Sequence, residues 1–281
     1  LLVDFLGFKQ KQNQDVSINQ AAYWSVAWVT VAMLFGGGLW LYLQQTAGVA
    51  LANQKAMEYF AGYLLEKSLA IDNVFVWLMI FAAFAIPPML QRKILLYGVL
   101  GAIVLRTIFI FIGAWFVQEF SWVLYIFGAF LVYTGFKFLK GQDEDTNIED
   151  NALLKWLRKH MRITPQLHDN QFFVRQNGLL WATPLFLVLI LVEASDVIFA
   201  VDSIPAIFAV TSDPFIVLTA NLMAILGLRA MFFLLAGAAT KLHYLPYGLG
   251  IILLFIGAKM LLLDVFHMPI WISLGFIVLV L

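Results

Sequence analysis

Residues 193–205 have the sequence EASDVIFAVDSIP, and its three carboxylates, Glu193, Asp196 and Asp202, lie inside an apolar segment that covers residues 180–210. About 20 predominantly apolar residues are enough to cross a lipid bilayer as a helix. A charged side chain at the centre of a bilayer costs at least about 2.5–3.5 kcal/mol, and such residues usually mark a functional site. The stretch therefore predicts a membrane helix whose acidic groups serve a function.

The composition of the whole chain is that of a membrane protein. Of its 281 residues, 63% are hydrophobic and 12% are charged, the mean hydropathy is +0.90 and the formal net charge is zero. The chain contains no cysteine, which excludes disulfides and thiolate metal sites. Without a nucleophile–base pair or a cofactor motif, we expect no enzyme, no resident cofactor and no nucleic-acid partner. No signal peptide is visible, and we expect the first and last spans to be incomplete.

Nine apolar segments predict an all-α polytopic membrane protein, with residues 1–281 as one transmembrane domain. They are residues 1–8, 21–43, 57–85, 94–117, 120–139, 180–210, 214–238, 245–263 and 268–281. The loops on one side of these spans, including residues 140–179, hold most of the lysine and arginine residues. Basic loops remain in the cytoplasm, so we predict an external N-terminus and a cytoplasmic 140–179 linker.

The chain also repeats itself, with residues 57–139 matching residues 180–263. Three pairs of features recur in the same order: Glu66 and Asp72 with Asp196 and Asp202, Leu105-Arg106 with Leu228-Arg229, and Gly128 and Gly135 with Gly250 and Gly257. Each repeat contains three spans, so the two copies must cross the membrane in opposite directions. Inverted repeats of this kind are typical of transporters, which bind substrate near the membrane midplane where the repeats meet.

The linker, residues 140–179, is the one long polar segment. Within it, residues 153–162 predict an amphipathic helix with a basic face and a tryptophan. Such a helix is typical of a segment that lies on the anionic cytoplasmic leaflet.

Six carboxylates in or near the spans are the candidate metal ligands: Asp4, Glu66, Asp72, Glu193, Asp196 and Asp202. Further oxygen or amide groups could complete a site, although each also suits helix packing: Asn73, Ser195, Ser203 and Asn221. Three intramembrane bases are candidate gates or counter-charges: Lys67, Arg106 and Arg229. Three bases cannot neutralise six acids, and oxygen ligands suit Mg²⁺, Ca²⁺ and Mn²⁺. We therefore expect a divalent cation as the cargo.

Helical spacing complicates the predicted site. Six residues advance a straight helix by about 600°, so Glu66 and Asp72 do not share a face, and neither do Asp196 and Asp202. Pro205 cannot donate to the carbonyl of Val201. We therefore predict a helix break beside Asp202 that turns both carboxylates of that motif inward.

The motifs EKSLAIDN, residues 66–73, and EASDVIFAVDSIP, residues 193–205, closely resemble those of the TerC family, named for tellurium resistance. The resemblance covers nearly the whole chain and is strongest to the Alx-like branch of bacterial manganese exporters. It implies an inner-membrane transporter related to the LysE superfamily that exports Mn²⁺ from the cytoplasm. It also implies that Glu66, Asp72, Glu193, Asp196 and Asp202 form the metal path, with Asp4 as the acidic residue of the first span.

Several alternatives remain open from the sequence. The carboxylates could pair with Lys67, Arg106 and Arg229 only to hold the bundle together. The protein could be a membrane scaffold or assembly factor in metal delivery or envelope stress, or an exporter of an organic cation or amino acid. Exchange of the metal for two protons is a hypothesis, because protons and metal ions compete for carboxylate oxygens. The oligomeric state is not predicted.

Overall fold

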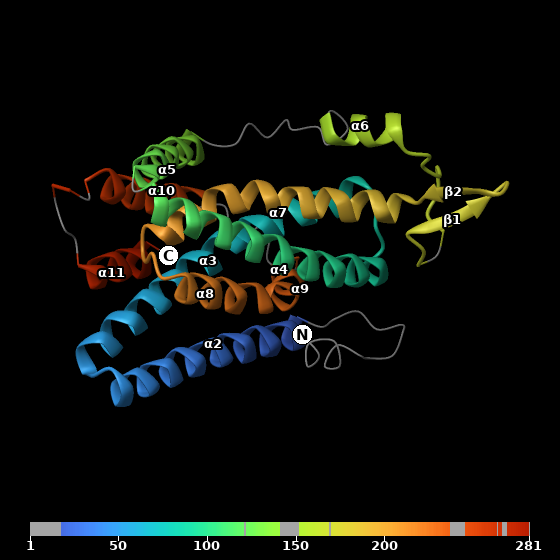
Figure 1. Ribbon diagram of the computed structural model, residues 1–281. Helices are drawn as coiled ribbons and strands as arrows, with labels where there is room; N and C mark the ends of the chain where they lie inside the picture. Colours follow the sequence, from blue (N-terminus) through green and yellow to red (C-terminus); the bar gives the residue numbers. More distant parts are fainter. Residues whose placement is uncertain are drawn as a thin grey trace.

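The computed structural model describes residues 18–120, 122–140, 152–168, 170–236, 245–262, 264–265 and 269–280. Asp4 and the predicted span at residues 1–8 lie outside these described residues. Within them the chain is mostly helical, with ten helices and one short β hairpin. The helices lie side by side, and α6 and the hairpin occupy one end of the bundle, at the right in Figure 1.

Each predicted span within the described residues coincides with a helix or a helix pair. The helices are α2 (Ile18–Thr46), α3 (Val49–Ala83), α4 (Pro88–Glu119), α5 (Val123–Lys140), α7 (Pro184–Phe208), α8 (Pro214–Leu226), α9 (Leu228–Ala236), α10 (Leu245–Leu261) and α11 (Ile270–Val280). Four of them are long and apolar enough to cross a membrane, and α8 and α9 together make a fifth candidate. The chain is therefore a polytopic membrane protein.

The linker contains more structure than the sequence predicted. Helix α6 (Ala152–His160) agrees with the amphipathic stretch, but strands β1 (Phe173–Gln176) and β2 (Leu179–Ala182) correct the all-α prediction. The strands pair antiparallel through a turn at Asn177 and Gly178, which have φ values of 53° and 76°. Asn-Gly is the dipeptide that favours a two-residue hairpin turn. The hairpin shortens the predicted span that began at residue 180, since α7 begins at Pro184.

The predicted helix break at Pro205 is wrong. Helix α7 continues through Pro205 to Phe208. The proline lies in the last turn, where it removes one backbone bond and leaves little helix beyond it to disrupt. An interruption lies elsewhere, because α8 and α9 meet at Gly227 at an angle of 42°.

The packing places α3 at the centre of the bundle. Helix α3 packs against α2, α7, α8 and α11, and α4 packs against α7 and α8. Large apolar side chains point outward from the peripheral helices, including Leu34 of α2 (70% exposed), Val104 of α4 (58%) and Tyr133 of α5 (67%). An outward apolar face of this kind suits contact with lipid, so the polar groups of the interior are enclosed by the helices themselves.

Helices α5 and α10 pack closely through glycines. A Cβ atom on Gly135 would lie 2.8 Å from the carbonyl oxygen of Gly250, and one on Gly128 would lie 3.1 Å from the carbonyl oxygen of Gly257. The contacts are reciprocal, because a Cβ on Gly257 would lie 2.8 Å from the carbonyl oxygen of Gly128. Small residues let membrane helices approach in this way. The two helices are therefore held at a backbone separation that larger residues would not permit.

We expect Gly135→Ala to destabilise the protein by about 1–3 kcal/mol, because the new methyl group would meet backbone atoms of α10. Thermal unfolding in detergent would show a lower midpoint. The control is Gly275→Ala in α11, where a Cβ meets nothing within 4 Å and the midpoint should be unchanged or slightly raised. Equal midpoints for Gly135→Ala and the parent protein would contradict the close packing.

Candidate functional site

A buried ion-pair centre joins three helices. The guanidinium of Arg106, from α4, lies between the carboxylates of Glu66, from α3, and Asp196, from α7, and each of the three residues is at most 2% exposed. Arg106 Nη1 lies 2.7 Å from Glu66 Oε2, and Arg106 Nη2 lies 2.9 Å from Asp196 Oδ1. Arg106 Nε also donates to Asp196 Oδ2 at 3.2 Å, so Asp196 binds the guanidinium through both oxygens.

Two neutral side chains complete this centre. Asn73 Nδ2 donates to Asp196 Oδ1 at 3.1 Å, and Arg106 Nη1 donates to the Ser203 hydroxyl at 3.4 Å. Both residues are 1% exposed. Asn73 and Ser203 are the residues that follow the second acid of each motif. The two motifs therefore meet at Arg106, with one carboxylate and one neutral group from each.

Several buried polar side-chain atoms of α3, α7 and α8 have no hydrogen-bond partner. They include Glu66 Oε1, Asp72 Oδ2, Asn73 Oδ1 and Glu193 Oε2, together with both polar atoms of the Asn221 side chain. The Asn221 amide lies beside Glu66 without making a hydrogen bond of ordinary geometry. Buried polar atoms are normally satisfied, and each exception in a folded protein requires an explanation. Most of these atoms are oxygens, which are the ligand type that hard cations bind.

The other predicted ligands lie farther along the helices. Asp72 is 7% exposed, Glu193 and Asp202 are half-buried, and Asp202 Oδ1 accepts a bond of 3.1 Å from the Thr134 hydroxyl of α5. In the part of the chain that the structure describes, no three acidic or histidine side chains lie close enough together to hold a metal ion. The spacing of six residues explains this separation, since α7 remains a regular helix beyond Asp196 and Asp202 therefore faces α5.

The remaining predicted residues have other surroundings. Lys67 donates to the carbonyl oxygen of Ala224 at 3.3 Å, in the last turn of α8, where the helix dipole favours a cation. Arg229 is buried in the first turn of α9. Ser195 donates to the carbonyl of Val192 in its own helix at 2.7 Å, a local bond that needs no ligand.

Gly101 is a site residue that the sequence analysis missed. A Cβ atom on Gly101, in α4, would overlap the carboxylate oxygens of Glu193. The carboxylate of Glu193 therefore rests directly against the backbone of α4, and only glycine leaves room for it. A glycine inside an apolar span was the available signal, but it indicates close packing as often as a site.

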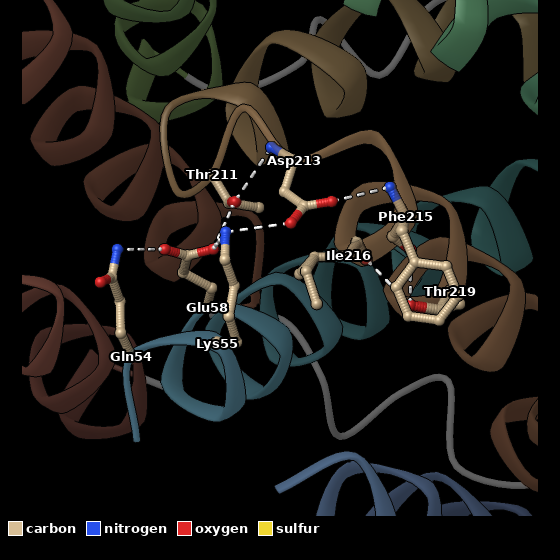
Figure 2. Close-up of polar contacts among 8 residues, drawn as sticks. All are labelled: Gln54, Lys55, Glu58, Thr211, Asp213, Phe215, Ile216 and Thr219. Carbon is tan, nitrogen blue, oxygen red and sulfur yellow. Dashed lines mark hydrogen bonds and ion pairs between the residues drawn. The ribbon is translucent and has the colours of Figure 1, made fainter. Parts of the chain in front are cut away.

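A second polar cluster was also missed. Lys55 and Glu58 of α3 contact Thr211 and Asp213 from the connection between α7 and α8, as Figure 2 shows. Glu58 is 6% exposed, although it lies at the very start of the predicted span at residues 57–85. A position at a span boundary does not by itself distinguish a buried acid from a solvated one.

The arrangement can exchange one cation for another. Two carboxylates face a single guanidinium, so the ionised centre retains one negative charge, and several unpartnered oxygens lie around it. Breaking a buried charge pair by removing one partner costs about 3–5 kcal/mol unless another charge replaces it. A metal ion or a proton that entered as Arg106 moved away would supply that replacement.

Comparisons with known proteins identify relatives of the whole chain. The model of the family described as "Integral membrane protein TerC family" matches residues 51–281. The chain is 61% identical over 275 residues to a Photorhabdus laumondii protein named "Putative membrane-bound redox modulator Alx", covering 98% of this chain and 86% of that protein. It is 58% identical over the same length to the Escherichia coli K12 protein of that name, with the same coverage. An uncharacterized membrane protein of Myxococcus xanthus is 44% identical over 272 residues, which cover 97% of this chain and 83% of that one. No solved structure matches.

We expect Gly101→Ala to fold normally but to displace the carboxylate of Glu193, because the atoms that a methyl group meets belong to the end of a flexible side chain. If Glu193 contributes to a cation site, titration calorimetry on the purified protein should show Mn²⁺ binding weakened severalfold. Gly37→Ala in α2 is the control, since a Cβ there meets nothing within 4 Å. Parent-like affinity in Gly101→Ala would exclude Glu193 from the site.

Proposed function

Because the chain belongs to the TerC family of integral membrane proteins, we propose that it is a transporter that exports divalent cations, with Mn²⁺ as the cargo, from the bacterial cytoplasm. The membrane is the inner membrane, with the N-terminus outside and residues 140–179 in the cytoplasm. Glu66, Asp196, Asp72, Glu193 and Asp202 line the path of the ion, and Asp4 contributes from the first span.

The observation that carries this proposal is the buried centre formed by Glu66, Arg106 and Asp196. A charge in the membrane interior is expensive, and ionisable residues there mark ion pathways. A purely structural ion pair would need only one carboxylate for each base. Here two carboxylates share one guanidinium, and buried oxygens nearby have no hydrogen-bond partner. An exchangeable cation accounts for both features.

In this proposal, the guanidinium of Arg106 occupies the position that the cargo ion takes when it binds. Its guanidinium occupies the space between the two acids in the state described. Entry of a divalent ion would displace Arg106 and bring Glu66 and Asp196 to one centre. Asn73 and Asn221, whose oxygens are buried and unpartnered, would supply neutral ligands.

The reciprocal glycine contacts support the inverted repeat. Gly128 meets Gly257, which is the repeat counterpart of Gly135, and Gly135 meets Gly250, the counterpart of Gly128. A twofold axis that relates the two repeats would convert each of these contacts into the other. We propose that such an axis relates residues 57–139 to residues 180–263, with nine spans in all. The bend at Gly227, beside the Nζ atom of Lys67, fits the interrupted helices of such transporters.

Proton exchange would provide the driving force. Moving a divalent cation out against an inside-negative potential costs about 4.6 kcal/mol per 100 mV, from about 2.3 kcal/mol per charge. Two protons moving inward would cancel this electrical cost. Carboxylates suit the exchange, because metal and proton compete for the same oxygens.

The name of the relatives favours a second candidate, a modulator of redox state. The 281 residues contain no cysteine, so these residues offer no thiol couple. We propose that any redox effect passes through the manganese that the protein exports, since manganese ions undergo oxidation and reduction. A scaffold in metal delivery and an exporter of organic cations or amino acids remain the alternatives that the following test addresses.

Export predicts that bacteria lacking the protein accumulate manganese and that the parent gene restores the normal content. We expect Glu66→Gln and Asp196→Asn to fail to restore it, because each removes a carboxylate that faces Arg106. Elemental analysis of washed cells grown in added Mn²⁺ measures the content, with magnesium, calcium and zinc measured in the same samples.

The matched control is Glu119→Gln, which alters an exposed carboxylate at the end of α4, outside the centre. Its expression level in membranes is compared with that of the other variants. Manganese content that is equal with and without the protein would exclude export of manganese. Restoration by the two carboxylate variants would exclude the proposed centre.

A further inference from the structure

The second polar cluster ties the two repeats together at one end of the bundle. Glu58, in the third turn of α3, accepts bonds from Gln54 Nε2 at 2.9 Å, from Lys55 Nζ at 2.9 Å and from Thr211 Oγ1 at 2.6 Å. The ammonium of Lys55 also lies 3.0 Å from Asp213 Oδ2. Figure 2 shows Lys55 pointing toward both carboxylates.

Two local hydrogen bonds position Asp213 in the connection between α7 and α8. Asp213 caps α8 by accepting a bond of 3.1 Å from the backbone N–H of Phe215, and its own N–H donates to Thr211 Oγ1 at 3.2 Å. A cap fixes the first turn of a helix. The carboxylate that meets Lys55 is therefore placed by α8 itself, so a movement of α8 relative to α3 must stretch or break the Lys55–Asp213 pair.

This cluster has the same arrangement of charges as the buried centre, at a different position along α3. In each case one basic side chain lies between a carboxylate of α3 and a carboxylate of the second repeat: Arg106 between Glu66 and Asp196, and Lys55 between Glu58 and Asp213. Glu58 and Glu66 are eight residues apart, which is about 12 Å along a helix. The side chains of the outer pair Lys55 and Asp213 are 22% and 32% exposed, so they lie at the boundary with solvent.

We infer that Lys55 is the external gate of the transporter, closing the path between α3 and α8 through its ion pairs with Glu58 and Asp213. The inference rests on the proposed function. With Lys55 in place, its positive charge opposes the passage of a cation and its contacts hold α3 against α8. When the pairs open, Glu58 and Asp213 present two carboxylates that draw the cation outward from the buried centre.

The position of this gate agrees with the predicted orientation. Lys55 lies in the second turn of α3, close to the connection with α2, at the end of the bundle opposite the hairpin and α6 (Figure 1). The basic loops are at the hairpin end, so the positive-inside rule places Lys55 outside. Few basic residues are expected on the external side, and Lys55 forms ion pairs there with Glu58 and Asp213.

The absence of cysteine from the 281 residues allows a direct test with a single reporter cysteine. Ala220, in α8, is fully buried and lies 3.4 Å from the position of a Cβ on Gly62, which is midway between Glu58 and Glu66 on α3. In Ala220→Cys we measure the rate of labelling by a membrane-impermeant maleimide added outside the cells. Adding Lys55→Gln should increase that rate roughly tenfold, the factor that about 1.4 kcal/mol represents.

Two controls accompany the gate variant. Lys55→Arg keeps the charge and should label at the parent rate. Lys259→Gln removes a lysine that donates to the Ser273 hydroxyl at 3.1 Å, outside the cluster, and should also label at the parent rate. A second reporter, Ala70→Cys, lies buried on α3 on the far side of Glu66 and should remain unreactive in Lys55→Gln.

An unchanged labelling rate for Ala220→Cys when Lys55→Gln is added would overturn the gate. Faster labelling at both reporters would also overturn it, because Lys55 would then stabilise the whole bundle. The labelling does not depend on the cargo. If the reporter in α8 becomes reactive while no variant changes cellular manganese, the gate stands and the proposed export fails. If export is normal and that reporter stays unreactive, the gate alone fails.

Discussion

The guanidinium of Arg106, held between the carboxylates of Glu66 and Asp196, is the interaction on which the rest of the structure depends. It joins α3, α4 and α7 at one buried point where water cannot substitute for a missing partner. Leaving one of these charges unpaired would cost several kcal/mol. The three helices therefore cannot separate at this level unless another cation takes the place of Arg106. In the proposed transporter, this requirement would couple the binding of a cation to the movement of the helices.

The outer cluster extends the same principle toward solvent. Lys55 links α3 to the connection before α8, and Arg106 links α3 to α7, each through carboxylates. Lys55 is partly solvated, and its pairs are correspondingly weaker. A cation moving outward would meet a strong, dry site first and a weaker, wetter one second. That order favours release to the outside. The glycine contacts between α5 and α10 form a close interface, because backbones in direct contact leave little room for sliding.

The sequence predicted the membrane class and the burial of the motif acids Glu66, Asp72 and Asp196, because long apolar segments surround them. Helical spacing also predicted that Asp196 and Asp202 would not share a face of a straight helix, but the break expected to turn both inward is absent. It could not predict that Pro205 would leave α7 intact, because the cost of a proline depends on how much helix follows it. The Asn177-Gly178 turn was readable in the sequence but overlooked, since the surrounding strands are short.

Which residues form the centre was harder to predict from the sequence than which segments contain them. Arg106 was predicted as a gate or counter-charge, but nothing in the spacing of the chain identified Glu66 and Asp196, rather than Asp72 or Asp202, as its partners. That choice depends on how α4 packs between α3 and α7. The burial of Glu58 was not predicted for a related reason, because its carboxylate meets Thr211 from a distant segment as well as Lys55. Contacts between distant segments decide these features.

Uptake of radioactive Mn²⁺ by inside-out membrane vesicles tests the central claim most directly. The vesicles are prepared from cells that contain the parent protein, Asp196→Asn or no protein, with and without an acidic interior. The account predicts that the parent vesicles accumulate Mn²⁺, faster when the interior is acidic, while Asp196→Asn vesicles accumulate no more than vesicles without the protein. Equal uptake in all three preparations would contradict the account.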